Sequence, residues 1–274
     1  MKRALFFAAA IAACVPASEE LPPTGAAGFV TEPSPATRGE PLVTIDGWTL
    51  VFEKVALAGD VSALVRTSGV SSYGRSAGWL WDAAQVVEIY VPAILVGPAS
   101  VNVELRGNYL PLSRGEDRRR HLGIAPELAD RFSRVPEQGL ANANDYGYGR
   151  GPSLIVIVRA ENEGRVKRMD VALTSGFSSR SALQDGPVID IREDQLSVRT
   201  LAIRVEALFE DASGGPMSFA DFAAADDEGN ADGTISAVEL LAHELTPKTG
   251  SSANRSTDLL ALLSSRGGSI LAPR

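Results

Sequence analysis

The chain has 274 residues and a formal net charge of −8, and its composition is that of a globular protein. Apolar residues make up 45% and charged residues 22%, so the chain as a whole is not predicted to be disordered. One cysteine and two histidines exclude an internal disulfide and leave little room for a Cys/His zinc site. The acidic balance disfavours a nucleic-acid partner, because binding to phosphates requires a basic face.

Residues 1–13 are predicted to be a signal peptide. Lys2 and Arg3 form a positive start, and residues 4–13 are ten apolar residues in a row. As a helix these ten residues would span about 15 Å, half of a bilayer core, which is too short for a membrane span.

The segment that ends the apolar run, Ile11-Ala12-Ala13-Cys14, resembles the lipobox of bacterial lipoproteins. The resemblance implies that cleavage before Cys14 is followed by acylation of this cysteine, which would anchor the protein stably to a membrane. Because Val15 and not an aspartate follows the cysteine, the resemblance also implies delivery to the outer membrane. The alternative is ordinary secretion with cleavage after Ala17.

Residues 14–42 are predicted to be the lipidated cysteine and a proline-rich tether. Six of the 16 prolines lie between residues 15 and 41, among Ala, Ser, Thr, Gly and Glu. This composition offers few apolar side chains for packing and favours extended conformations. The folded body is therefore expected to begin at residue 43.

Residues 43–210 are predicted to form a mainly β body. In Ser100–Arg106, apolar residues alternate with polar ones, the pattern of a half-buried antiparallel strand. Further strands are expected at Trp48–Ala58, Val86–Val96, Ser153–Val158, Val166–Thr174 and Leu196–Phe209. Strands do not alternate with helices, so the predicted fold is an antiparallel sandwich or an open barrel.

Three local features complete this outline. A hairpin turn is expected at Glu161–Gly164, with Gly164 at a positive φ. Residues 111–151 are expected to form a long excursion from the sheet, with a short helix after Pro126. Residues 248–274 are predicted to be a C-terminal tail with an amphipathic helix at Thr257–Arg266.

The negative charge is concentrated near the C-terminus. Residues 205–247 contain ten acidic residues and no Lys or Arg. Removal of Lys2 and Arg3 would leave 24 basic against 34 acidic residues, a net charge of −10, so this stretch carries the whole net charge of the mature chain.

Residues 228–239 resemble the calcium loop of the EF-hand family. Gly233 matches the sharp turn at the sixth loop position. The residues that match ligand positions three, five, seven and twelve are Asn230, Asp232, Thr234 and Glu239. The resemblance implies a Ca²⁺ ion held between two helices of a module at residues 211–247, and we expect the ion to have a structural role.

The first loop position leaves two alternatives open. It falls on Glu228, where the family has aspartate; otherwise Asp226 supplies the first carboxylate in a loop two residues longer. A capping box at Ser218–Asp221 is expected to open the entering helix, and Ser236–Leu245 the exit helix. A metal-free helix–loop–helix with solvated acids is a third alternative.

A wider resemblance is to β-rich bacterial envelope lipoproteins that end in an EF-hand-like loop. The segments that carry it are Asp46-Gly47-Trp48-Thr49, Gly59-Asp60-Val61, Leu208-Phe209 and Phe219–Asp226. These proteins have no assigned activity to carry over, so the resemblance implies a fold and a location only.

The function expected from the sequence is therefore that of a non-enzymatic, lipid-anchored envelope protein with a structural calcium site. The alternative is a surface protein that binds a carbohydrate or a protein partner through residues 111–151, with calcium incidental. A hydrolase is a third alternative. Ser76 stands in a G-x-S-x-G pattern, but the pattern lacks the preceding buried strand, and the chain offers only His121 and His243 as bases.

Overall fold

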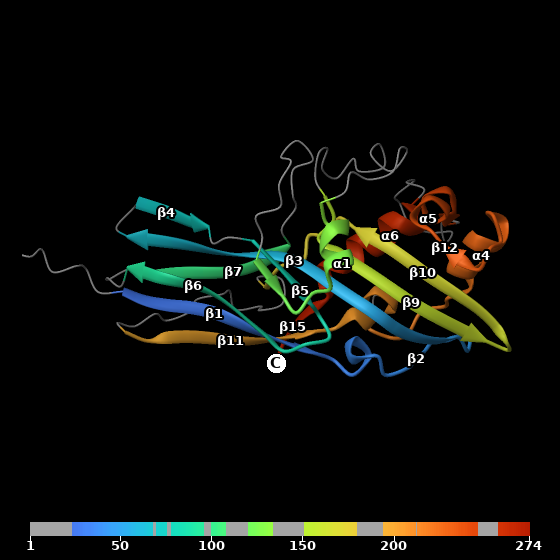
Figure 1. The fold of residues 1–274 in the computed structure, drawn as a ribbon, viewed down its shortest axis with the longest axis horizontal. Helices are drawn as coiled ribbons and strands as arrows, with labels where there is room; N and C mark the ends of the chain where they lie inside the picture. The colour runs from blue at the N-terminus through green and yellow to red at the C-terminus, as the bar shows by residue number, and fades with distance from the viewer. Residues whose placement is uncertain are drawn as a thin grey trace, which may run out of the picture.

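The computed structural model describes residues 24–67, 70–75, 78–95, 100–107, 120–133, 151–179, 194–211, 213–245 and 257–274. It confirms the mainly β class and shows an elongated molecule built along one long strand, β3 (Figure 1). The strands are β1 (Thr24–Pro33), β2 (Leu42–Val43), β3 (Thr49–Thr67), β4 (Val70–Arg75), β5 (Trp79–Asp82), β6 (Val87–Leu95), β7 (Ser100–Gly107), β8 (Arg120–Leu122), β9 (Leu154–Asn162), β10 (Arg165–Leu173), β11 (Leu196–Ile203), β12 (Thr234–Ile235), β13 (Glu244–Leu245), β14 (Thr257–Asp258) and β15 (Leu271–Pro273). The helices are α1 (Pro126–Arg131), α4 (Ala220–Glu228), α5 (Ala237–Ala242) and α6 (Leu259–Arg266), with 3₁₀ turns η1 (Ala36–Arg38), η2 (Val205–Phe209) and η3 (Gly267–Ser269).

The larger sheet has the order β12-β10-β9-β3-β5-β8, and β2, β4 and β7 also pair with β3. The first half of β3 pairs with β9, and its second half pairs with β4 and β7. The sheet is open, because its path ends at β12 on one side and at β8 on the other.

The predicted purely antiparallel arrangement is wrong, because three strand pairs are parallel: β1 with β11, β10 with β12, and β5 with β8. The strands of each pair are separated by long stretches of chain, so the chain can return in either direction. The sheets are therefore mixed.

The smaller sheet has the order β15-β11-β1-β6, and it changes the limits of the folded body. Residues 24–42, which the composition assigns to the tether, include β1, a strand between β11 and β6 with Ala27 and Phe29 buried. At the other end of the chain, β15 pairs with β11, so residues 271–273 are part of this sheet and not a free tail.

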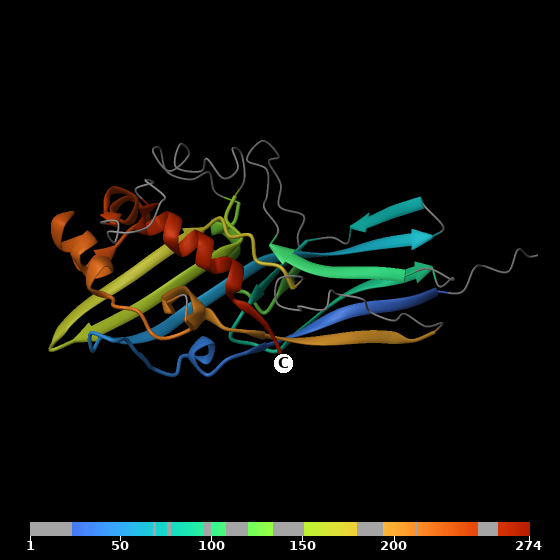
Figure 2. The ribbon, with the colours of Figure 1, turned by 180° about the vertical axis from the view of Figure 1, so that it is seen from behind.

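Strand β9 is central, as its continuous apolar sequence indicates, and both of its faces are covered. Ile155 and Ile157 lie in a cluster with helix α1, whereas Leu154, Val156 and Val158 lie in the main core. The opposite placement of α1 and of α4, α5 and α6 is visible by comparing Figures 1 and 2. Because both faces are covered, apolar residues do not alternate with polar ones along this strand.

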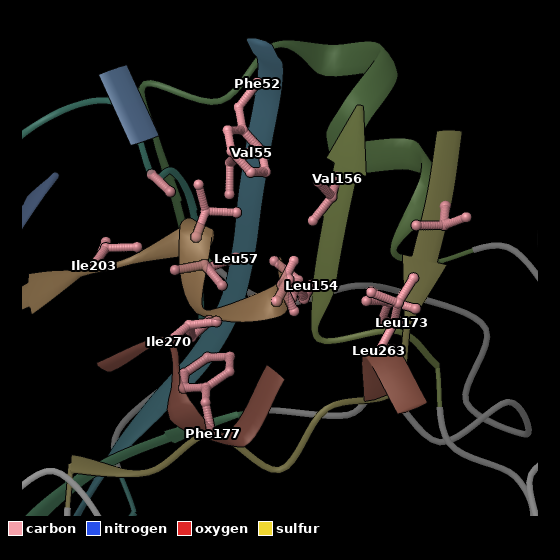
Figure 3. Close-up of a cluster of buried hydrophobic side chains, with 14 of the residues drawn as sticks. Phe52, Val55, Leu57, Leu154, Val156, Leu173, Phe177, Ile203, Leu263 and Ile270 are labelled. Carbon is pink, nitrogen blue, oxygen red and sulfur yellow. The ribbon is translucent and has the colours of Figure 1, made fainter. Parts of the chain in front are cut away.

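The main core lies between the larger sheet, the smaller sheet and the C-terminal helices. Figure 3 shows side chains of β3, β9 and β10 meeting Ile203, Leu263 and Ile270 from the C-terminal part of the chain. Helix α6 begins at an N-cap, Asp258, whose carboxylate accepts a hydrogen bond from the Ala261 amide at 2.7 Å. The predicted C-terminal helix is thus confirmed, and it packs onto the sheet through its leucines.

Other local predictions have mixed outcomes. Glu163 and Gly164 form the two-residue turn between β9 and β10 with φ values of 49° and 80°, which confirms the hairpin. Helix α1 confirms the helix after Pro126. The strand expected over residues 196–209 is shorter, because β11 ends at Ile203 and η2 follows. Within the described ranges, no helix combines the length and apolar character needed to cross a bilayer.

Candidate functional site

The acidic segment forms a compact helix–loop–helix: α4, a short loop, β12 and α5. The start of α4 is held by Asp46, from the turn before β3. Its carboxylate accepts hydrogen bonds from the Phe219 amide at 3.0 Å and the Ala220 amide at 2.9 Å, and from the Ser218 hydroxyl at 2.8 Å. The predicted capping box between Ser218 and Asp221 is therefore wrong, because a distant carboxylate already satisfies the open amides.

Aromatic packing fixes α4 to the body. Phe219 stacks on Phe222 with ring centroids 5.4 Å apart, and the Trp48 ring lies 5.3 Å from the Phe219 ring. Phe209 contacts both phenylalanines and joins them to Phe52 of β3. The segments of the wider lipoprotein resemblance around Asp46 and Phe219 are thus in direct contact, which sequence order alone does not reveal.

The loop after α4 turns through two residues with positive φ, Ala231 at 54° and Gly233 at 86°. It then enters β12, which pairs with β10, and the Arg168 amide donates to the Gly233 carbonyl at 2.8 Å. The helix α5 that follows opens with a capping box between Ser236 and Glu239. This exit helix ends at Ala242, three residues earlier than expected.

The two candidates for the first calcium ligand lie in different surroundings. Asp226 is fully buried, and its carboxylate accepts a hydrogen bond from the Gly233 amide at 3.2–3.3 Å. Glu228 is 72% exposed, and its carboxylate lies 3.2 Å from Nδ1 of His243. Asp226, and not Glu228, therefore closes the loop.

The other predicted ligands accept hydrogen bonds from the backbone of the loop. Oδ1 of Asn230 accepts from the Asp232 amide at 2.9 Å, and Oδ1 of Asp232 accepts from the Thr234 amide at 2.7 Å. Oε1 of Glu239 accepts from the Asn230 amide at 3.2 Å, and its Oε2 accepts from the amide and hydroxyl of Ser236 at 2.8 and 2.9 Å. The side chains of Asn230 and Asp232 are exposed at the loop surface.

A Ca²⁺ ion requires six to eight oxygen ligands that converge at 2.3–2.6 Å. Asp226 and Glu239 accept hydrogen bonds from backbone amides of the loop, whereas Glu228 is exposed and contacts His243. Among the residues that the structure describes, no three His, Cys, Asp or Glu side chains gather closely enough to hold a metal ion. The calcium site stays a prediction from the sequence.

One charged residue of the site, Lys167 on β10, was not among the residues selected from the sequence. Its ammonium donates to Oδ2 of Asp226 and, at 2.7 Å, to Oδ1 of Asp227. The signal was present in the alternation of β10, where Lys167 shares a face with apolar residues. The neighbouring Arg165 also binds Asp227, at 2.5 Å, so β10 supplies the positive charge that residues 205–247 lack.

The ionisation of this cluster follows from its contacts. Burial by itself lowers the pKa of Lys167, but its hydrogen bonds to Asp226 and Asp227 and the charges of these carboxylates raise that pKa above its ordinary value. The hydrogen bond from Lys167 holds the pKa of Asp227 below its ordinary value, although desolvation opposes this, and Arg165 adds to the lowering. Both groups are therefore charged at neutral pH.

The remaining candidate residues are only partly described by the structure. Cys14, Ser76 and most of residues 111–151 lie outside the described part of the chain. His121 is on β8, on the far side of β5 from β3, and His243 contacts Glu228. Comparison of the chain with protein-family models, curated protein sequences and solved structures found no match.

Proposed function

We propose that the protein is a non-catalytic cell-envelope protein, held at the outer membrane by a lipid on Cys14. The observation that carries the proposal is the position of the one cysteine in the chain, directly after a short apolar segment and two alanines. A thiol at this place is what a lipidating enzyme requires, and the mature chain would start with the cysteine.

We infer further that residues 211–247 are a structural module, similar to an EF-hand in its helix–loop–helix order. The contacts of Asp46 and Trp48 with Phe219 of the module, and the pairing of β12 with β10, support a fixed position on the body. In this proposal the module joins the larger sheet to the C-terminal strand β15, since α6 and β15 follow it in the chain.

The test of lipid anchoring is the mass of the mature protein from membranes, for the wild type and for Cys14→Ser. The wild type is expected to start at Cys14, to carry acyl chains and to partition into detergent. The Cys14→Ser variant is expected to lose the acyl mass and the membrane association. A wild-type protein that starts at Ser18 without acyl chains would show ordinary secretion and overturn the proposal.

A second candidate function, binding of a protein partner, is favoured by an apolar row on the smaller sheet. Gly28 of β1 pairs with Tyr90 on one side and with Val198 on the other, so these residues share a face of the sheet. Leu196 lies two residues before Val198 and shares this face. Leu196 is 55% exposed, and Tyr90 and Val198 are each 44% exposed. Exposed apolar side chains that share one face of a sheet are typical of a protein interface.

A photo-crosslinking residue placed at position 198 in intact cells tests this candidate. The matched control is the same residue at position 238, because Val238 on α5 is also exposed, at 47%, but lies in the module. A protein adduct formed from position 198 and not from position 238 supports partner binding. Equal yields at both positions, or none at either, argue against it.

A further inference from the structure

Lys167 occupies a position in the sheet that is otherwise apolar. On β10 it shares a face with Met169, Val171 and Leu173, all buried beneath the helices, and its own side chain is only 8% exposed. Burying an ammonium without a partner is strongly unfavourable. A lysine at this position therefore requires an anionic partner, and Asp226 and Asp227 supply it.

The carboxylates that Lys167 meets are themselves in an unfavourable place. Asp226, Asp227 and Glu228 form the last turn of α4, which contains no basic residue. The C-terminal end of a helix carries partial negative charge, so acidic side chains there are destabilising unless a cation compensates them. Asp226 has no exposed surface through which solvent could compensate its charge.

We propose that the ammonium of Lys167 is the resident cation of this helix–loop–helix and takes the role that a divalent metal ion has in EF-hands. It binds Asp226 and Asp227 at once, and Asp226 in turn binds the Gly233 amide that closes the loop. One charged group thus connects β10, the end of α4 and the loop. The module is stable without a divalent metal ion.

The same contacts oppose binding of a divalent ion. Such an ion would have to share the Asp226 carboxylate with an ammonium of the same charge sign, or displace it from a buried position. It would also have to compete for the Glu239 carboxylate with the Asn230 amide of the loop and with the Ser236 amide of the capping box. The inference is independent of lipid anchoring at Cys14, so either can fail without the other.

The test is thermal unfolding of the purified protein in excess calcium chloride and in EDTA, for the wild type, Lys167→Met and Arg168→Met. Methionine keeps most of the length of lysine but removes the charge. Arg168 is the matched control, because it is the next residue on β10, faces outward and pairs with Glu53 at the surface.

The midpoint of the wild type is expected to differ by less than about 1 °C between calcium and EDTA, since a ligand that does not bind adds no stability. Lys167→Met is expected to unfold about 10 °C below the wild type in both conditions, and Arg168→Met within about 2 °C of it. Stabilisation of the wild type by calcium that Asp226→Asn abolishes would overturn the proposal. Equal decreases of the unfolding midpoint in Lys167→Met and Arg168→Met would also overturn it. If Lys167→Met does not fold, the comparison of the wild type in calcium and in EDTA still tests the proposal.

Discussion

The two faces of the sheet around β9 are covered in different ways. Beneath α1 lies a cluster of buried apolar side chains, and the ion pair at its edge, Arg131–Asp170, is partly exposed. Its members are Ala56, Ala58, Leu80, Ile124, Leu128, Ala129, Phe132, Ile155 and Ile157. Beneath α4, α5 and α6, apolar and aromatic side chains are accompanied by the buried Lys167–Asp226 pair and the Asp46 cap.

The difference shows two ways of holding a helix on a sheet. Apolar burial has no direction, so α1 is stabilised in proportion to the area it covers. The polar contacts of the module have fixed partners: Lys167 fixes the end of α4 against β10, and Asp46 fixes its start against the turn before β3. We therefore expect the α1 face to respond to lost volume, and the module face to respond to lost charge and to acid.

The largest effect is expected on the apolar face. Phe132→Ala removes a fully buried ring beneath α1, and the free energy of unfolding should fall by about 3–5 kcal/mol. Urea denaturation measures this loss, with Asp130→Ala on the exposed side of α1 as the control, expected to change stability by less than about 0.5 kcal/mol. A loss below about 1 kcal/mol for Phe132→Ala would mean that α1 contributes little to the fold.

A smaller effect is expected at the cap of α4. Asp46→Ala removes the acceptor of the Phe219 amide and leaves the Ala220 amide only the Ser218 hydroxyl, at 3.1 Å, so the free energy of unfolding should fall by about 1–2 kcal/mol. Asp221→Ala, which removes the exposed residue of the capping box expected from the sequence, should cost less than about 0.5 kcal/mol. Equal losses in the two variants would contradict the assignment of the cap to Asp46.

The module face should also respond to pH. The pKa of Asp227 is held low, first by the hydrogen bond from Lys167. Burial raises the pKa of Asp46, but its hydrogen bonds from Thr44, Phe219 and Ser218 lower it by more. Groups with a lowered folded-state pKa contribute stability above their unfolded pKa, near 4, and lose it as the pH falls through the folded value.

Unfolding by urea across a pH series tests this expectation. From these two carboxylates the wild type should show constant stability from pH 6 to 8 and a loss below about pH 4. The pKa of Lys167 is raised, so its contribution is fully present below about pH 10.5 and is lost only as the pH rises through the higher folded value. In Asp227→Asn the free energy of unfolding should fall less steeply below about pH 4 than in the wild type. An identical fall in the two proteins would show that Asp227 does not contribute to the loss of stability in acid.

The smallest effect is expected in the loop. Ala231 is exposed and has a φ of 54°, a conformation that is strained for residues with a Cβ atom. Ala231→Gly should therefore raise the free energy of unfolding by about 0.5–1 kcal/mol, whereas Ala224→Gly inside α4 should lower it by a similar amount. A loss of stability at position 231 would mean that the loop does not hold this backbone conformation.

Much of the fold could be predicted from the sequence, because strands of period two and tight turns are local signals. Ser100–Arg106, the Glu161–Gly164 turn and the helix after Pro126 needed only neighbouring residues. Strand β1 was missed because its proline, glycines and alanines resemble a tether. Its pairing with β11, some 170 residues later in the chain, makes it a strand.

The candidate site was predictable only in part. The acidic cluster, the turn at Gly233 and the second helix were visible in the sequence around Glu239. The capping carboxylate of Asp46 and the ammonium of Lys167 come from distant parts of the chain, so no local sequence pattern predicts which residues they contact. An inward-facing lysine in an alternating strand signals a buried anion, but not which of ten acidic residues supplies it.

The central claim, that Lys167 and Asp226 hold the module to the sheet as a pair, is tested most directly by a double-mutant cycle. Lys167→Met, Asp226→Asn and the double variant are compared with the wild type by urea denaturation, with the exposed Arg168–Glu53 pair as a control cycle. The account predicts a coupling energy of about 1.5–3 kcal/mol for the buried pair and below about 1 kcal/mol for the control. Additive losses at Lys167 and Asp226, within about 0.5 kcal/mol, would contradict it.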